Sequence, residues 1–395
     1  MIFMGHISFK IFNLGILLPL ISSMLLVFWI HPMIVKTALL KDIVDKPDYR
    51  KLQKKPVPVL GGVAVYWGIV IGAGITSMAF HSHALLTSIV ALTVMIYIGT
   101  LDDIQGLSPT LRLVIEILVV AFVAYMDQSS MNHFHGLFGI EKLPVYLSAP
   151  LCIIGSVGII NAINMIDGVD GLSSGFCMLA CASFGALFVA AYNGPMIVMS
   201  MLGLGAIIPF FFHNVFGQKS KMFIGDSGTL MMGMLMSIFC MRILDNTSVV
   251  ALRFPNIGVV AFCLSVLSVP VFDTLRVMIG RIMKGVSPFH ADRSHLHHLF
   301  LEIGFSHLGT SFMVLSLNLL NILAWLATYL LGGSVTLQFI VVFIIGFINT
   351  TGFLYVVRRL DHSKKPYRAL AYLAKLSHVE AGKFYCKMRE IVDRI

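Results

Sequence analysis

The stretch IINAINMIDGVDGLSSG, residues 159–175, sets four polar side chains among apolar neighbours at steps of three residues: Asn161, Asn164, Asp167 and Asp170. Residues three apart are turned by about 60° around a helix, so a straight helix cannot aim all four at one point. The glycines that follow both aspartates favour a break in the helix. Amide and carboxylate oxygens are ligands typical of magnesium, not of zinc. The stretch therefore predicts a magnesium site, with a purely structural kink as the alternative.

Two adjacent carboxylates, Asp102 and Asp103, end a second apolar run in the stretch GTLDDIQGLSP. Neighbouring carboxylates repel each other unless a cation or a proton lies with them. One of the pair could take a proton from a substrate phosphate while the other helps to hold a divalent ion. The alternative is a solvated helix cap.

A further carboxylate, Asp226, lies between two glycines at the start of an apolar run, in the stretch FFFHNVFGQKSKMFIGDSGTLMMG. Asn214 and two lysines precede it. Together with the Asp and Asn residues of the other clusters, Asp226 indicates magnesium chemistry. Because aspartate is also a favoured first residue of a helix, a simple N-cap is the alternative.

Basic residues gather in the stretch DKPDYRKLQKKPVPVLGG, residues 45–62, which holds Arg50 and Lys54. Lysine can bind a polyphosphate by its charge, and arginine can bind it by paired hydrogen bonds. The alternative is the ordinary excess of basic residues in the inner loops of a membrane protein.

Histidines are dense in the stretch SPFHADRSHLHHLF, residues 287–300. His295, His297 and His298, with Arg293, indicate either a zinc site or contacts to phosphate. Phosphate contacts are favoured, because no cysteine or carboxylate is spaced to close a tetrahedral zinc site.

The chain is too apolar for a soluble protein: of its 395 residues, 57% are hydrophobic and 12% are charged, and the mean hydropathy is +0.89. A helix needs about 20 apolar residues to cross the hydrocarbon core of a bilayer. This rule predicts an all-α polytopic membrane protein, a bundle of about eleven transmembrane helices, near 12–35, 61–80, 84–101, 110–126, 147–164, 172–192, 195–213, 227–244, 256–282, 309–331 and 335–357.

The placement of positive charge predicts the orientation of these spans. With the N-terminus outside, the inner loops and the tail hold 24 of the 28 Lys and Arg residues, as the positive-inside rule requires. We therefore expect a cytoplasmic C-terminus, with all five polar clusters on the cytoplasmic side. Residues 1–357 form the expected transmembrane domain. Residues 358–395 form a basic tail, expected to lie as an amphipathic helix on the inner leaflet or to be solvated.

Taken together, the clusters favour phosphoryl transfer at a membrane face, because they combine magnesium ligands, phosphate-binding cations and an apolar surround suited to a lipid substrate. An ion-coupled transporter is a competing class, but its carboxylates would lie near the midplane at a repeat interface. An intramembrane aspartyl protease could use Asp167 and Asp226 as its pair. The protease interpretation gives no function to the Asp102–Asp103 pair or to the histidine loop.

These motifs resemble the polyprenyl-phosphate N-acetylhexosamine-1-phosphate transferases, in particular the bacterial branch that uses UDP-GlcNAc, over roughly residues 12–357. The matching motifs are NAINMIDGVDGL, GDSGT, DDIQG, HADRSHLHH and, in the basic stretch, Asp45, Pro47, Arg50, Lys51, Pro56, Pro58, Gly61 and Gly62. The related muramyl-pentapeptide branch usually has a lysine where Gly106 stands, and a PLHHHF-like loop where this chain has SHLHHLF. These two departures argue against that substrate.

The resemblance implies a helical bundle with an active-site groove on the cytoplasmic face of the bacterial inner membrane. It implies that undecaprenyl phosphate attacks a UDP-N-acetylhexosamine, that UMP leaves, and that Mg²⁺ is the cofactor, with Mn²⁺ as a substitute. The partners are then these two substrates and membrane lipids, with no nucleic acid and with a homodimer as an option. The amino sugar and the glycan pathway stay open.

The resemblance also implies residue roles. It puts the metal on Asp226 with Asn164 or Asp167, and the lipid phosphate at Asp102 with Asp103 in support. The other implied substrate contacts are Lys54 and Arg50 for phosphate, Asn214 and Asp170 for the nucleotide, and Arg293, His295, His297 and His298 for the sugar diphosphate. Asn161 is a further expected substrate contact, and the aspartates 102, 103, 167 and 170 with the three histidines are the expected catalytic residues.

Overall fold

The computed structural model describes residues 11–45, 56–77, 82–288, 294–361 and 363–394. Its α-helices are α2 Leu18–Leu40, α3 Gly61–Ser77, α4 His83–Gln105, α5 Pro109–Met126, α6 Val145–Met165, α7 Leu172–Ala191, α8 Gly194–Phe216, α9 Gly225–Ile243, α10 Val249–Arg253, α11 Val259–Val266, α12 Ser268–Met283, α13 Leu296–Ile303, α14 His307–Leu330, α15 Val335–Phe347, α16 Phe353–Arg359, α17 Lys365–Leu376 and α18 Lys383–Asp393. Two π-helical stretches are η1 Ile11–Leu17 and η2 Ile348–Gly352. The strands are β1 Val44–Asp45, β2 Val57–Pro58, β3 His133–Leu137 and β4 Ile140–Lys142.

Within these described ranges, eight helices are long and apolar enough to cross a membrane, and the bent pair α11 and α12 makes a ninth candidate. The polytopic helical class that we predicted is therefore confirmed. Helices also occupy the two other expected spans. Of these, α3 is shorter, with 17 residues, whereas α9 is buried along nearly its whole length. The count of eleven stays a prediction.

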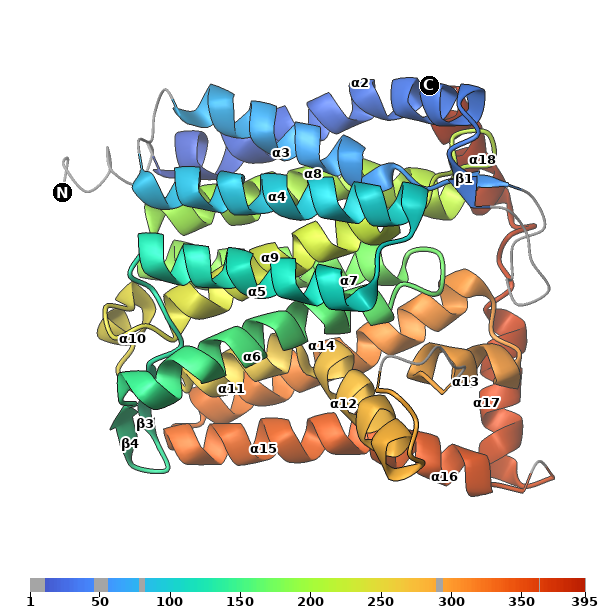
Figure 1. Cartoon of the computed structure of the whole chain (residues 1–395). Coiled ribbons are helices and arrows are strands. Elements are labelled where there is room, and N and C mark those ends of the chain that lie inside the picture. The colour runs from blue at the N-terminus through green and yellow to red at the C-terminus, as the bar shows by residue number, and fades with distance from the viewer. Residues whose placement is uncertain (1–10, 46–55, 78–81, 289–293, 362, 395) are drawn as a thin grey trace.

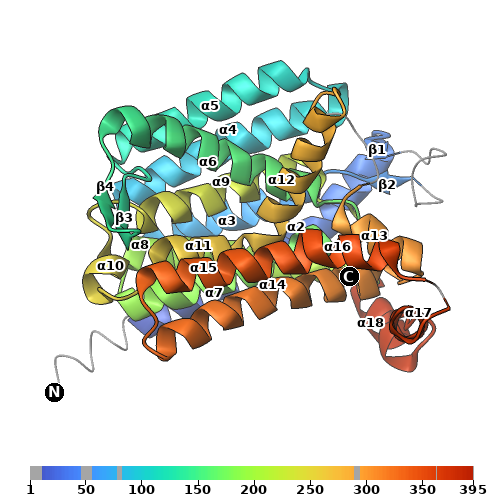
Figure 2. The ribbon, with the colours of Figure 1, turned by 90° about the horizontal axis from the view of Figure 1, so that it is seen from below.

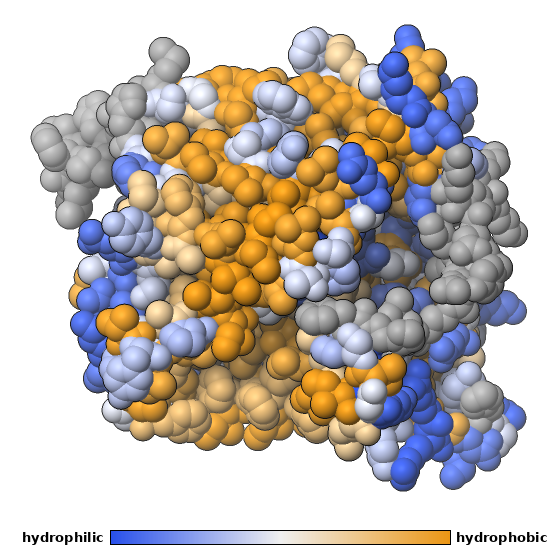
Figure 3. Space-filling view, in the orientation of Figure 1, coloured by the Kyte–Doolittle hydropathy of each residue, from blue (hydrophilic) through white to orange (hydrophobic). Residues whose placement is uncertain are grey.

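The helices lie side by side, with α9 inside the bundle between α3, α4 and α6 (Figures 1 and 2). The hairpin of β3 and β4, which pairs His133 with Lys142, lies with α10 at one end. The other end carries the β1–β2 pair, α13, α17 and α18, and we call it the site end. Apolar side chains cover the middle of the face seen in Figure 3, and hydrophilic ones gather toward both ends.

The expected span 256–282 is broken into α11 and α12, which are bent by 76°. The break is stabilised by Asn318 of α14. Its Oδ1 accepts hydrogen bonds from Ser268 Oγ and Val269 N, both at 3.0 Å, and its Nδ2 donates to the Val266 carbonyl at 2.9 Å. A span can break inside a bundle where a neighbouring side chain satisfies the freed backbone groups. Sequence periodicity carried no sign of this partner.

Two glycines let neighbouring helices approach the first turn of α9. A Cβ atom at Gly62 of α3 would overlap the backbone of Gly228, and a Cβ atom at Gly99 of α4 would overlap the backbone of Ser227. Small residues permit such close contacts between membrane helices. The start of α9, with Asp226, is thereby clamped between α3 and α4.

Candidate active site

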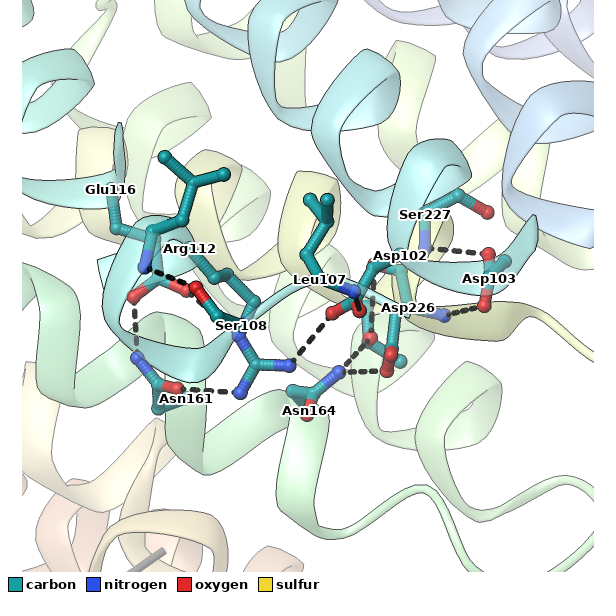
Figure 4. A network of polar contacts seen from close by, with 12 residues as sticks. Asp102, Asp103, Leu107, Ser108, Arg112, Glu116, Asn161, Asn164, Asp226 and Ser227 are labelled. Atoms are coloured by element: carbon teal, nitrogen blue, oxygen red, sulfur yellow. Dashed lines mark hydrogen bonds and ion pairs between the residues drawn. The ribbon is translucent and has the colours of Figure 1, made fainter. Parts of the chain in front are cut away.

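Asp103 caps the N-terminus of α9. Its Oδ1 accepts a hydrogen bond from the Asp226 backbone N–H at 2.8 Å, and its Oδ2 accepts one from Ser227 N–H at 3.0 Å (Figure 4). The first N–H groups of a helix have no partner within the helix, and a carboxylate there also meets the positive end of the helix dipole. Asp103 thus positions α9 from the last turn of α4.

Asp226 meets Asn164 from the end of α6. Asn164 Nδ2 donates to Asp226 Oδ1 at 2.6 Å (Figure 4). It also donates to Thr229 Oγ1 at 2.8 Å. The side chains of Asp226 and Asp102 are also close enough to share a hydrogen bond. Two carboxylates at this separation need a proton or a cation between them.

Asp102 has a partner at each carboxylate oxygen. Its Oδ1 accepts from Leu107 N–H at 2.6 Å, and its Oδ2 accepts from Arg112 Nη1 at 3.1 Å. Gly106 stands between them in a left-handed conformation, with φ at +69°, which glycine adopts without strain. The turn between α4 and α5 therefore holds the Asp102 carboxylate in a fixed orientation.

Behind Asp102 lies a polar network inside the bundle that includes two residues we did not predict, Arg112 and Glu116. Asn161 Nδ2 donates to Glu116 Oε2 at 2.5 Å, and Arg112 Nη2 donates to Asn161 Oδ1 at 3.4 Å (Figure 4). Glu116 is buried. A carboxylate in the middle of an apolar run was the signal available in the sequence. Asn161, a predicted substrate contact, belongs to this network.

The loop between α6 and α7 carries Asp167 and Asp170. Asn214 of α8 ties this loop to a neighbouring segment: its Oδ1 accepts from Gly171 N–H at 2.7 Å, and its Nδ2 donates to the Met222 carbonyl at 3.0 Å. Gly171 adopts a left-handed conformation with φ at +78°. Asn214 therefore connects the two segments that carry the aspartates and Lys221.

Asp170 Oδ2 lies 2.6 Å from Lys221 Nζ and 3.0 Å from His307 Nδ1. Burial by itself would raise the pKa of Asp170. The hydrogen bond from His307 and the charge of Lys221 outweigh it, so the pKa of the Asp170 carboxyl lies below its usual range. Asp170 is thus an anion held between the Lys221 ammonium and the His307 ring. Lys221 and His307 are further site residues that we did not single out from the sequence.

Asp167 opens into the cavity described below. Although its side chain is exposed to the cavity, protein atoms surround the cavity on most sides. The resulting loss of hydration raises the pKa of Asp167 to about 8. The nearby carboxylates Asp226 and Asp170 raise it further. An aspartate in such surroundings binds either a proton or a cation at neutral pH.

The histidine loop is anchored by Asp273 of α12. Asp273 Oδ2 lies 2.8 Å from His295 Nδ1, its oxygens accept from Leu296 N–H at 3.1 Å, and its Oδ1 accepts from Arg276 Nη2 at 2.6 Å. Asp273 thus caps α13 and orients His295. A carboxylate within the predicted span 256–282 was the sequence signal that we missed.

The three histidines have different surroundings. His295 and His297 are buried, whereas His298 lines the cavity. His297 packs against Gly168, where a Cβ atom would overlap its ring. Burial, followed by the neighbouring rings of His298 and His295, lowers the pKa of His297 to about 3. His297 is therefore neutral at pH 7 and acts in packing the loop between α6 and α7.

A cavity of about 1030 Å³ at the site end gathers most of the predicted residues. It is lined, among the residues we predicted, by Asp102, Asp103, Asn164, Asp167, Asp170, Asn214, Asp226 and His298. Asn161, His295 and His297 support its walls from outside this lining. Arg50, Lys54 and Arg293 lie outside the described residues.

The donor set at Asp226, Asp102, Asn164 and Asp167 fits a magnesium ion. Within the described ranges no group of three or more His, Cys, Asp or Glu forms a ready metal cage. Mg²⁺ does not need one, because it usually keeps several waters and binds through one or two carboxylates plus substrate phosphates. Added positive charge would relieve the repulsion between the neighbouring carboxylates of Asp226 and Asp102.

Comparison with known proteins finds a family match and several similar proteins. Residues 85–244 match the family described as Glycosyl transferase family 4. A Bacillus subtilis (strain 168) protein named probable undecaprenyl-phosphate N-acetylglucosaminyl 1-phosphate transferase is 28% identical over 346 residues, which cover 85% of this chain and 93% of that protein. Proteins named undecaprenyl-phosphate alpha-N-acetylglucosaminyl 1-phosphate transferase are also similar. That of Yersinia pestis is 28% identical over 69% of this chain and 73% of its own length, and that of Escherichia coli (strain K12) is 29% identical over 67% and 70%.

The family match spans Asp102, Asp103, the aspartates of the α6–α7 loop and Asp226. The resemblance that we predicted from these motifs is therefore confirmed: the chain matches Glycosyl transferase family 4 and is similar over most of its length to the undecaprenyl-phosphate N-acetylglucosaminyl 1-phosphate transferases.

Proposed function

We propose that this protein transfers GlcNAc-1-phosphate from UDP-GlcNAc to undecaprenyl phosphate and releases UMP. The observation that carries the proposal is the meeting of Asp102, Asp226 and the Asp167–Asp170 loop in one cavity, although they come from three separate stretches of the chain. The names of the similar proteins supply the acceptor and the sugar phosphate. The UDP part of the donor follows from the family resemblance.

The proposal includes an orientation, with the site end facing the cytoplasm of a bacterial inner membrane and eleven spans in all. The charge distribution supports it, since 24 of the 28 Lys and Arg residues fall in the segments that would then lie inside. A donor that carries a nucleotide is cytoplasmic, so the cavity must open on that side.

We propose Mg²⁺ as the cofactor, held by Asp226 with Asn164 and Asp167, and with Mn²⁺ as a substitute. A bound ion of this kind neutralises charge on the diphosphate and on the UMP that leaves. In the structure, Asn164 donates its Nδ2 to Asp226 Oδ1 at 2.6 Å. Rotation of this carboxamide by half a turn would present its oxygen instead.

In the proposed reaction an oxygen of the lipid phosphate forms a bond to the β-phosphorus of the UDP-sugar. The bond from that phosphorus to the oxygen shared with the α-phosphate breaks, and UMP leaves with its electron pair. A phosphate monoester is already ionised at pH 7, so a general base gains less than it would with an alcohol. We therefore assign Asp102, which Arg112 and Leu107 hold in place, to orienting the lipid phosphate for direct attack.

Asp103 has a different task, because both of its oxygens accept hydrogen bonds from the first turn of α9. It positions Asp226. On the donor side we assign Lys221 and His298, which line the cavity, to the diphosphate, and Asp170 with Asn214 to the nucleotide. The proposed phosphate contacts of Arg50, Lys54 and Arg293 concern residues outside the described ranges.

The test is UMP release by the purified full chain, given UDP-GlcNAc, undecaprenyl phosphate and Mg²⁺. We expect UMP only when the lipid is present, none with EDTA, and a loss of about a hundredfold or more in Asp226→Ala. Glu141→Gln is the matched control, because Glu141 is exposed on β4 at the opposite end of the bundle. It should keep full activity.

If UMP is released only from a different UDP-N-acetylhexosamine, the proposed sugar is wrong, but the proposed reaction type is kept. No UMP from any UDP-sugar, including the muramyl-pentapeptide donor, in a monodisperse preparation would refute the transferase and favour the transporter class.

A further inference from the structure

The segment formed by α17 and α18 has no part in the reaction as described, yet it folds against the site end (Figures 1 and 2). Ser377, just after α17, is joined to the start of α14: Ser306 N–H donates to Ser377 Oγ at 2.9 Å, and Ser306 Oγ donates to the Ser377 carbonyl at 2.6 Å. The ring of Tyr385 in α18 packs on Phe216, with centroids 5.0 Å apart. The segment is therefore docked on the body of the protein.

Three residues of this segment line the cavity: His378, Glu380 and Tyr385. Tyr385 also donates its hydroxyl to the Val215 carbonyl at 2.6 Å. Val215 follows Asn214 in the chain and lines the same cavity. One wall of the cavity is thus built by residues beyond position 357.

Asp393, at the end of α18, is bonded to the turn that follows α8. Its Oδ1 accepts hydrogen bonds from the backbone N–H groups of Gln218 and Lys219, both at 3.0 Å, and of Ser220 at 3.1 Å, and from Ser220 Oγ at 3.0 Å. Its Oδ2 adds a second contact to Gln218 N–H at 3.2 Å. Successive N–H groups that converge in a turn form an anion-binding concavity, and here a carboxylate of the chain itself fills it.

The next residue after this turn is Lys221, whose Nζ lies 2.6 Å from Asp170 Oδ2 in the cavity. The 218–220 turn therefore links Asp393 directly to a cation on the donor side. A shift of this turn would move Lys221 and, through Met222, the hydrogen bond to Asn214.

We propose that Asp393 is a positioning residue of the donor site: by holding the 218–220 turn it fixes Lys221 beside Asp170, where the lysine meets the phosphates of the UDP-sugar. The inference rests on the proposed function for the identity of the substrate. It makes the α17–α18 segment a structural part of the active site. Asp393 acts through the turn, and only Lys221 touches substrate.

The test compares Asp393→Asn with Glu390→Gln in the full chain. Glu390 lies one turn earlier in α18, where its exposed side chain contacts Arg394 at 3.9 Å, so this variant also removes one carboxylate from α18. Asparagine keeps the shape of Asp393 but loses its charge and half of its accepting capacity. Hydrogen exchange of the amides of 218–221 is measured first, without substrate. We expect about tenfold faster exchange in Asp393→Asn and no change in Glu390→Gln.

Steady-state kinetics are the second readout. We expect KM for UDP-GlcNAc to rise about tenfold in Asp393→Asn, with kcat within about twofold, because a donor contact is loosened while the reacting groups stay in place. Tyr385→Phe, which removes the hydroxyl bonded to Val215, should raise KM in the same direction by a smaller factor. If Asp393→Asn does not fold, Tyr385→Phe still tests whether contacts from α18 to the end of α8 position the donor site.

Equal exchange rates in Asp393→Asn and Glu390→Gln would overturn the proposal, since the carboxylate would then not hold the turn. Faster exchange with an unchanged KM would overturn the link from the turn to the donor site. A wild-type protein that releases no UMP would refute the proposed reaction alone, and the exchange data would still decide whether Asp393 holds the turn.

Discussion

Asp102 and Asp103 are adjacent in the chain, yet their carboxylates meet different parts of the molecule. Asp103 accepts two backbone hydrogen bonds from the first turn of α9, so its role follows from the helix terminus that it caps. Asp102 is held by Arg112 and Leu107 and lies beside Asp226. The sequence indicated one carboxylate as a base and the other as a metal ligand, with a helix cap as the alternative. Their different roles arise because the two neighbouring side chains point in different directions, and the motif does not show these directions.

At the residue scale, the raised pKa of Asp167 leads to a prediction of how magnesium binding depends on pH. Because its pKa is raised to about 8, the carboxyl holds a proton in the metal-free protein below that pH, and a metal ion must displace it. Affinity for Mg²⁺ should therefore rise with pH, by up to about tenfold per unit between pH 6.5 and 8, and level off above. Calorimetric titration with MgCl₂ in buffers of different ionisation heat measures both the affinity and the released protons.

Asp167→Asn is the control for this dependence, since it has no proton to release at that position. It should bind Mg²⁺ more weakly and with a flatter pH profile. An Mg²⁺ affinity that does not change with pH in the unmodified protein would show that Asp167 is not a ligand.

At the element scale, the sequence predicted the helices well and their partners poorly. Apolar runs of sufficient length correctly indicated helices at all eleven expected positions, because membrane helices must satisfy their backbone internally. The bend between α11 and α12 depends on Asn318, which is far away in the chain. The docking of α18 depends on Asp393 meeting a turn more than 170 residues earlier. Such tertiary partners leave no local periodicity.

The packing of α3 on α9 gives a prediction at this scale. Gly62→Ala would push a Cβ atom into the backbone of Gly228, which moves the first turn of α9 and with it Asp226. We expect a loss of about 1–3 kcal/mol in stability, as overpacking usually causes, and a lower rate of UMP release. Thermal unfolding in detergent, followed by the activity assay, measures both effects.

Gly74→Ala on the same helix is the matched control, because a Cβ atom at Gly74 has no neighbour within 4 Å. Alanine is the better helix former by about 1 kcal/mol, so this variant should be neutral or slightly more stable. If Gly62→Ala behaves like Gly74→Ala, then α3 does not clamp the start of α9.

At the scale of the whole molecule, the polar clusters form one site because the bundle brings the ends of α4, α6, α8 and α9 together. Four of the five clusters have a structural alternative, and part of one applies, because Asp103 is a cap. The structure adds a packing role for His297 in the fifth cluster. The functional interpretation rests on their convergence. If the donor is the proposed UDP-sugar, the interpretation also requires that the site faces the cytoplasm.

A single exposed cysteine, Cys386, allows the side of the membrane on which α18 lies to be measured. Cys386 in α18 is exposed, whereas the other five cysteines are buried, so a membrane-impermeant maleimide should label one position. With the site end in the cytoplasm, we expect labelling in inverted membrane vesicles and none in intact cells, and Cys386→Ser should abolish it. A thiolate reacts only where the reagent reaches it, so the contrast reports the sidedness of α18. Labelling in intact cells would place α18 and the cavity that it lines outside, away from any nucleotide donor, and would refute both the positive-inside orientation and the proposed reaction.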